Sequence, residues 1–159
     1  MKPIGPIGLI GPISLIGLIL AGCAGIVYYP ERTENRLHPL GMAVYNNSGE
    51  NISESDWIAY FTTIEMAYES LRQCVGGFDK EIDKELRARP IVISKEIKLI
   101  FASGEVIGFT DLQTIYIRRA SFSLDILKHE WIHNYLYLTG KRLFGDFLHR
   151  DQLFKKCSF

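Results

Sequence analysis

Two histidines and a glutamate near the C-terminus have the types and spacing that metal-assisted chemistry requires. In the segment His129-Glu130-Trp131-Ile132-His133 the two histidines stand four residues apart. On a helix this spacing puts both imidazoles on one face, where they can bind one metal ion. The carboxylate of Glu130 then lies beside that ion and can take a proton from a water molecule. The segment therefore predicts a metal site that includes its own general base.

A catalytic zinc site needs a third protein ligand, which must come from elsewhere in the chain. A downstream glutamate is excluded because none follows Glu130, and Thr139 occupies the position where a metzincin would carry its third histidine. The remaining candidates are His149, Asp146 and Asp151. We expect His149 to be the ligand because neutral imidazole is the commonest metal ligand, with an aspartate as the alternative.

The segment HEWIHNYLYLTG resembles the active-site helix of the zincin metallopeptidases. The resemblance implies that His129 and His133 bind Zn2+ and that Glu130 is the general base in peptide-bond hydrolysis. This segment, followed by His149 and then a C-terminal cysteine, is also similar to small secreted or lipoprotein peptidases of bacteria. That second similarity supports His149 as the third ligand and implies a peptide or protein substrate.

Two long helices are expected, one carrying the motif and one far upstream. Ser121 or Ser123 can cap a helix that runs through the motif and ends at Thr139-Gly140. Upstream, an apolar stripe at four-three-four-three spacing predicts a helix that begins after Ser53 and ends at Gly76-Gly77. The stripe is made of Trp57, Phe61, Ile64, Tyr68 and Leu71. A further short helix is expected from residue 149 to residue 156.

Between the two helices the pattern changes to short β-branched segments separated by turn residues. These segments are residues 91–93, 97–101, 106–110 and 114–117. The last two predict a hairpin. A helix, a short mixed sheet and then the motif helix is the order of a zincin-like α+β domain. In that family a strand beside the cleft pairs with the substrate, and we expect it to be 114–117, with a position inside the sheet as the alternative.

The N-terminus reads as a targeting signal. Lys2 precedes an apolar stretch from Ile4 to Ala21, and Leu20-Ala21-Gly22-Cys23 resembles the bacterial lipobox. The resemblance implies that residues 1–22 are a signal peptide and that Cys23 carries a lipid in the bacterial cell envelope, at the outer membrane if one is present. A transmembrane anchor is the alternative, disfavoured by the glycines and prolines of the stretch. Residues 23–50 are expected to be a tether, and residues 51–159 the folded domain.

With Cys23 assigned to the lipid, Cys74 and Cys157 remain. An even number of cysteines in an oxidising compartment predicts one disulfide, which would hold the segment after His149 in place. Two buried free thiols are the alternative.

The overall charge is balanced, with 18 basic and 18 acidic residues. This balance favours neither nucleic acid nor an electrostatic membrane patch, so the membrane partner is expected only through the lipid. Three functions remain open: a lipid-anchored zinc metallopeptidase acting on envelope proteins or peptides, an amidase of cell-wall peptides, and a non-catalytic lipoprotein with a zincin fold. The presence of Glu130 favours an enzyme, because a purely structural zinc needs no base.

Overall fold

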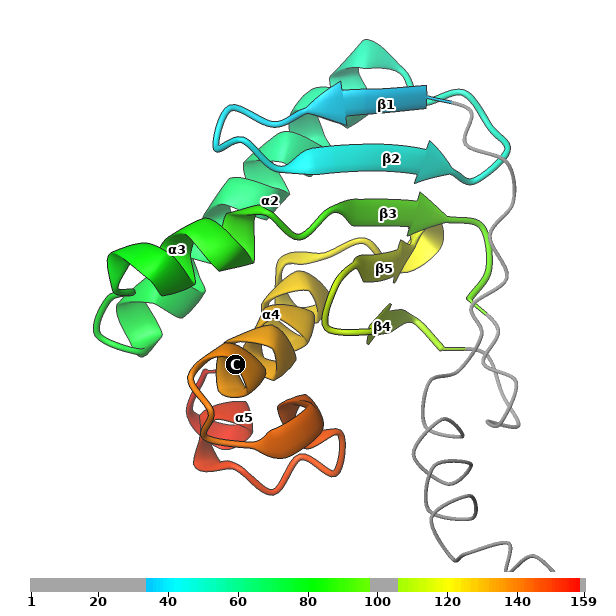
Figure 1. Ribbon diagram of the computed structural model, residues 1–159. Coiled ribbons are helices and arrows are strands. Elements are labelled where there is room, and N and C mark those ends of the chain that lie inside the picture. Colours follow the sequence, from blue (N-terminus) through cyan, green and yellow to red (C-terminus); the bar gives the residue numbers. More distant parts are fainter. Residues whose placement is uncertain (1–33, 98–105, 158–159) are drawn as a thin grey trace, which may run out of the picture.

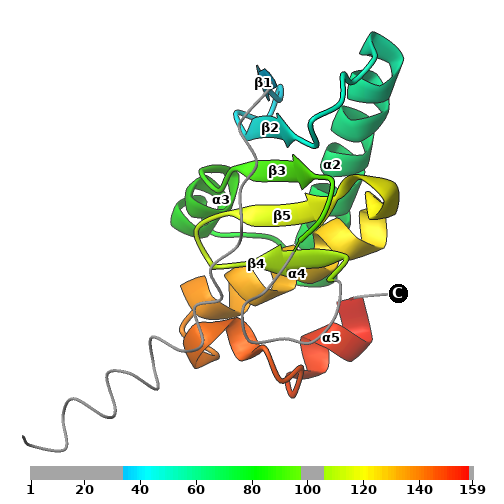
Figure 2. The ribbon, with the colours of Figure 1, turned by 90° about the vertical axis from the view of Figure 1, so that its right-hand side faces the viewer.

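The computed structural model describes residues 34–97 and 106–157, which form an α+β domain with a five-stranded mixed sheet (Figure 1). The four α-helices gather on one face of the sheet, as the two views together show (Figure 2). The opposite face carries a smaller apolar cluster. The signal and the lipidation residue expected at the N-terminus lie outside the described residues.

The sheet has the strand order β1-β2-β3-β5-β4. Its strands are β1 (Glu34–Leu37), β2 (Ala43–Asn47), β3 (Ile91–Ser94), β4 (Gly108–Thr110) and β5 (Ile115–Arg118). The three central strands β2, β3 and β5 run parallel, and β1 and β4 are antiparallel to their neighbours at the two edges. The β4–β5 pair confirms the hairpin expected from the sequence.

The helices begin at capping residues that the sequence supplies. They are α2 (Glu54–Cys74), α3 (Lys80–Arg87), α4 (Leu124–Leu138) and α5 (Gln152–Cys157). Two 3-10 turns, η1 (Arg119–Ser121) and η2 (Leu143–Asp146), join them to neighbouring elements. The side chains of Ser53, Asp79 and Ser123 each accept a hydrogen bond from a backbone N–H in the first turn of the next helix. These caps confirm the predicted starts of the two longer helices.

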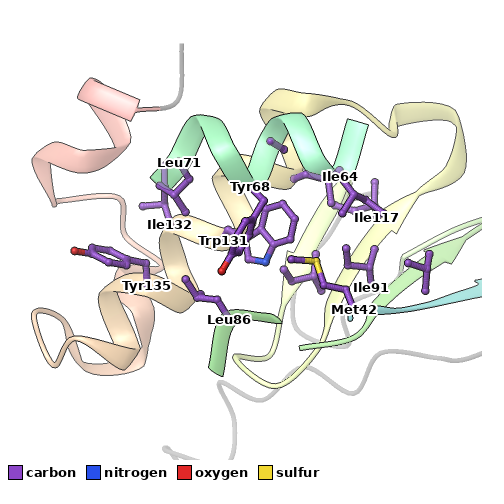
Figure 3. Close-up of a cluster of buried hydrophobic side chains, with 14 of the residues drawn as sticks. Met42, Ile64, Tyr68, Leu71, Leu86, Ile91, Ile117, Trp131, Ile132 and Tyr135 are labelled. Atoms are coloured by element: carbon purple, nitrogen blue, oxygen red, sulfur yellow. The ribbon is translucent and has the colours of Figure 1, made fainter. Parts of the chain in front are cut away.

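The main core lies between the sheet and α2 and α4 (Figure 3). The apolar stripe of α2 is buried at Trp57, Ile64, Tyr68 and Leu71, so it forms core as expected. Trp131 of α4 is fully buried and packs edge-on against Tyr68. This packing fixes the rotation of α4 about its axis, and therefore the direction in which its histidines point.

The tether expected over residues 23–50 is wrong for its second half, because residues 34–47 include β1 and β2. Pro39 and Gly41, which suggested irregular chain, lie in the turn of this hairpin, where Gly41 has a φ of 86°. Met42 and Val44 are fully buried. The segment is therefore part of the domain, and the strands were missed because each is too short to show a clear alternation.

The strand expected at the substrate edge is also placed differently. Residues 115–118 form β5, which lies between β3 and β4, and β4 is the outer strand on this side in the described chain. β5 has buried residues on both faces, as an interior strand requires. The alternative position, inside the sheet, is therefore correct. Of the strand expected over 97–101, residues 98–101 lie outside the described residues.

In the described part of the chain, no helix combines the length and the apolar character that crossing a membrane requires.

Candidate metal centre

Helix α4 places the two histidines of the motif on one face. Their rings lie 5.0 Å apart between centroids, one helical turn from each other. Leu127, Trp131 and Ile132 are fully buried against the core, which holds the helix in this orientation. His133 is buried and His129 half-buried, so the pair lies at the border between core and solvent.

The third histidine joins this pair. The Nε2 atom of His149 lies 3.1 Å from Nε2 of His129 and 3.2 Å from Nε2 of His133. All three ligand atoms lie within 4.8 Å of one another. Nitrogen atoms bound tetrahedrally to one ion at about 2.0–2.1 Å are about 3.3 Å apart. The two separations that involve His149 are close to this value, and the three imidazoles lie close enough together to bind one metal ion.

His149 is held by a loop with unusual backbone geometry. Gly145 has a φ of 69°, and a Cβ at this position would lie 2.7 Å from the carbonyl oxygen of His133. Only glycine allows such a close approach to α4. His149 itself has a φ of 52° and lies before α5, which begins at Gln152, so the helix expected from residue 149 to 156 starts later than predicted.

The orientation of the His133 ring is set by a backbone carbonyl. Its Nδ1 lies 2.7 Å from the carbonyl oxygen of Gly145. Because a carbonyl can only accept, Nδ1 carries the proton and donates it, which leaves the lone pair of Nε2 free for a metal. A backbone acceptor leaves no residue-type signal, so it could not be identified without the fold.

The two aspartates considered as third ligands serve the loop instead. The carboxylate of Asp146 accepts a hydrogen bond of 2.5 Å from the backbone N–H of Asp151. Asp151 forms an ion pair of 3.3 Å with Arg142 and accepts a hydrogen bond from the backbone of Leu153. Among the described residues, the cluster of possible ligands contains the three histidines and neither aspartate.

A disulfide secures the far side of the cluster. Cys74, at the end of α2, is bonded to Cys157, at the end of α5, which confirms the predicted bridge. Phe154, in the same helix as Cys157, is buried and packs against all three imidazoles, with ring centroids 4.7 to 5.2 Å apart. The bridge thus holds the helix whose phenylalanine forms an apolar wall behind the histidines.

Burial favours the neutral state of His129 and His133, which is the state that binds metals. Desolvation lowers the pKa of His133 to about 4, despite the opposing effect of its hydrogen bond to the backbone of Gly145. Burial also lowers the pKa of His129, and the nearby His149 adds to this shift. The same desolvation raises the pKa of Glu130 to about 8 in the metal-free protein. A cation bound beside this carboxyl favours its charged form and opposes that shift.

Glu130 faces the outer strand of the sheet. A Cβ on Gly108 of β4 would lie 2.9 Å from Oε1 of Glu130 and 2.6 Å from Ile126. The missing side chain therefore makes room for the carboxylate. The backbone of Ile107 accepts a hydrogen bond from Arg118, so the alternation of the ladder points the N–H and C=O of Gly108 away from β5. Sequence reasoning missed Gly108, although a glycine inside a strand pattern is a known sign of close approach.

A buried hydrogen-bond network ties α4 to the β4–β5 hairpin. The amide of Asn134 donates to Oγ1 of Thr110 at 3.0 Å, and this hydroxyl donates to the carbonyl of Thr114, also at 3.0 Å. The N–H of Leu112 donates to the same hydroxyl. These bonds fix the strand beside Glu130 relative to the helix that carries the histidines.

Comparison of the chain with family models, with curated proteins and with solved structures finds no match. The function is therefore inferred from the geometry of the metal centre.

Proposed function

We propose that the protein is a zinc-dependent metallopeptidase with a zincin-like domain. The observation that carries this proposal is the arrangement around α4. One ring nitrogen from each of the three histidines lies within 4.8 Å of the others. The carboxyl group of Glu130, which follows His129 in the sequence, lies beside an outer strand. A site with three protein ligands leaves a coordination position for water, as catalytic zinc sites do.

The residues of the site have separate roles in hydrolysis. A zinc ion bound by His129, His133 and His149 would supply Lewis acidity, both to a water molecule and to the carbonyl group of the substrate. Glu130 takes the proton of the attacking water and later transfers it to the leaving amine. Its carboxyl lies beside the outer strand, and a cation bound nearby would favour the charged form that accepts the proton. Phe154 excludes water from the rear of the histidines.

The substrate is an extended peptide that adds to the edge of the sheet along β4. The outward N–H and C=O groups of Gly108 can pair with its backbone, which supplies binding without demanding a sequence. Pairing at Gly108 brings a peptide bond next to Glu130, because the two residues are already in close approach. This assigns to β4 the role that the sequence suggested for the neighbouring strand.

A lipid on Cys23 would anchor the enzyme in the bacterial cell envelope. The support for this part is the Leu20-Ala21-Gly22-Cys23 sequence after an apolar stretch. The disulfide between Cys74 and Cys157 is consistent with an oxidising compartment. Envelope proteins or peptides are then the substrates within reach.

Metal content and turnover, measured on matched variants, test the proposal. The wild-type protein should bind about one zinc per chain and cleave peptides, and His149→Ala should lose or weaken the zinc. Glu130→Gln should keep the zinc and lose turnover, since it removes the base and not a ligand. Asp146→Asn is the control for the third ligand, because Asp146 lies in the same loop but outside the cluster. Wild-type turnover in Glu130→Gln, or no bound zinc in any variant, would reject the mechanism.

A further inference from the structure

Large apolar side chains are exposed in the loop that leads to the histidine cluster, and one of them, Phe147, contacts His133. Phe144, Phe147 and Leu148, which we call the 144–148 patch, are 57%, 42% and 69% exposed. They lie in the loop that ends at His149. Scattered apolar residues are common on protein surfaces, whereas neighbouring ones in a single patch mark a binding site.

Phe147 connects the histidine cluster to the outer strand. Its ring stacks on that of His133, with centroids 4.9 Å apart and an angle of 28° between planes. It also stacks on Phe109 of β4, with centroids 6.3 Å apart and an angle of 17° between planes. The ring therefore lies between a predicted metal ligand and the strand expected to bind the substrate. The exposed part of the Phe147 ring can contact a ligand group that lies beside His133 and β4.

The loop that carries the patch has a positive φ at residues other than glycine. Phe144 has a φ of 57° and Asp146 a φ of 58°, in the left-handed region that disfavours residues with a side chain. Strain of this kind persists where the surroundings impose it, and it concentrates at functional sites. Phe144 is mostly exposed, so burial of its ring does not offset the strain. Contact with a ligand would account for an exposed aromatic residue at position 144.

We infer that the 144–148 patch is a subsite for a bulky apolar side chain of the substrate, next to the bond that is cleaved. Phe147 is the residue that determines this specificity. The inference rests on the proposed peptidase function and adds the class of substrate to it. Removing a leucine or phenylalanine side chain from water against Phe147 favours such substrates over polar ones by roughly 10- to 100-fold.

Cleavage of a mixture of synthetic peptides with randomised central positions tests the inference. The zinc-loaded full chain is compared with Phe147→Ala, and the cleavage sites are read by mass spectrometry. The wild type should prefer phenylalanine or leucine at one position beside the cleaved bond, and Phe147→Ala should reduce this preference to a few-fold. Ile58→Ser is the control, because Ile58 is similarly exposed, at 62%, near the start of α2. It should leave the preference unchanged.

Binding separates failure of the inference from failure of the proposed function. Cleavage with no apolar preference, or a preference that survives in Phe147→Ala, overturns the subsite while leaving the peptidase intact. If no peptide is cleaved, the peptidase proposal fails. The subsite is then judged from the affinity of zinc-loaded Glu130→Gln for two peptides that differ only by leucine or serine. Equal affinities overturn it. The subsite is also overturned if Phe147→Ala reduces binding to phospholipid vesicles and changes neither the cleavage nor the binding of peptides.

Discussion

Removal of the disulfide is expected to weaken both the fold and the metal centre. The bridge joins Cys74 to Cys157 across a sequence separation of 83 residues. On the chain-entropy model a closed loop of this length stabilises the folded state by about 4.5 kcal/mol. For a domain of this size the double variant Cys74→Ser/Cys157→Ser should therefore melt roughly 15 °C lower than the wild type.

The metal centre should respond because the bridge anchors α5. Phe154 packs against all three imidazoles, and His149 lies three residues before this helix. Without the bridge the helix can leave α2, and the third ligand is held less firmly. We expect zinc affinity to fall about tenfold, which is the lower end of the effect seen when groups that orient metal ligands are lost.

Two measurements on the same samples check this prediction. Thermal unfolding with excess chelator gives the stability of the metal-free domain, and competition with a zinc chelator of known affinity gives the binding constant. Wild-type protein reduced with a thiol is the control, and it should behave like the double variant. An unchanged melting temperature would contradict the chain-entropy reasoning. A lower melting temperature with unchanged zinc affinity would show that the bridge stabilises the fold without holding the site.

Three further predictions concern individual residues of the site. Burial raises the pKa of Glu130 from 4.5 to about 8, so in the metal-free protein the folded state keeps a proton that the unfolded state has lost. The lowered pKa values of His133 and His129 act in the opposite direction below about pH 6.5. Stability should therefore fall as the pH rises from about 6.5 to 8, and urea unfolding of Glu130→Gln should lack this fall; equal slopes would contradict the assignment. Gly145→Ala should destabilise the metal-free protein by roughly 2 kcal/mol more than Gly140→Ala in the same unfolding assay. Both glycines have a positive φ, and only Gly145 has atoms of α4 in the way, so equal losses would refute the steric argument. Gly108→Ala should lower kcat at least tenfold while zinc content stays near one per chain, because its Cβ displaces the carboxylate of Glu130; an unchanged kcat would count against this reading.

Local patterns were enough to predict the elements that carry the site. Helix periodicity and capping located α4 and α2, since both depend on residues within a few turns of each other. The turn residues between Thr110 and Thr114 located the β4–β5 hairpin for the same reason. The hairpin of β1 and β2 was missed, because β2 is stabilised by pairing with β3, more than 40 residues later in the sequence, and β1 in turn pairs with β2. Long-range pairing of this kind leaves little trace in a short segment.

The sequence by itself determined which residues can bind a metal and which can act as the base. The spacing of His129 and His133 is sufficient for this, because a helix puts residues four apart on one face whatever surrounds it. It also identified His149 by residue type, and the pair of cysteines by their number.

Only the tertiary structure decided how these residues meet. His149 reaches the other two histidines because Gly145 lets its loop touch α4 and because a disulfide holds the following helix. The strand beside Glu130 is β4 and not its neighbour, since strand order depends on contacts across the whole sheet. The exposed rings next to His133 also became visible only in three dimensions. Each of these features arises from contacts between segments far apart in the chain, which the spacing of residues within one segment does not encode.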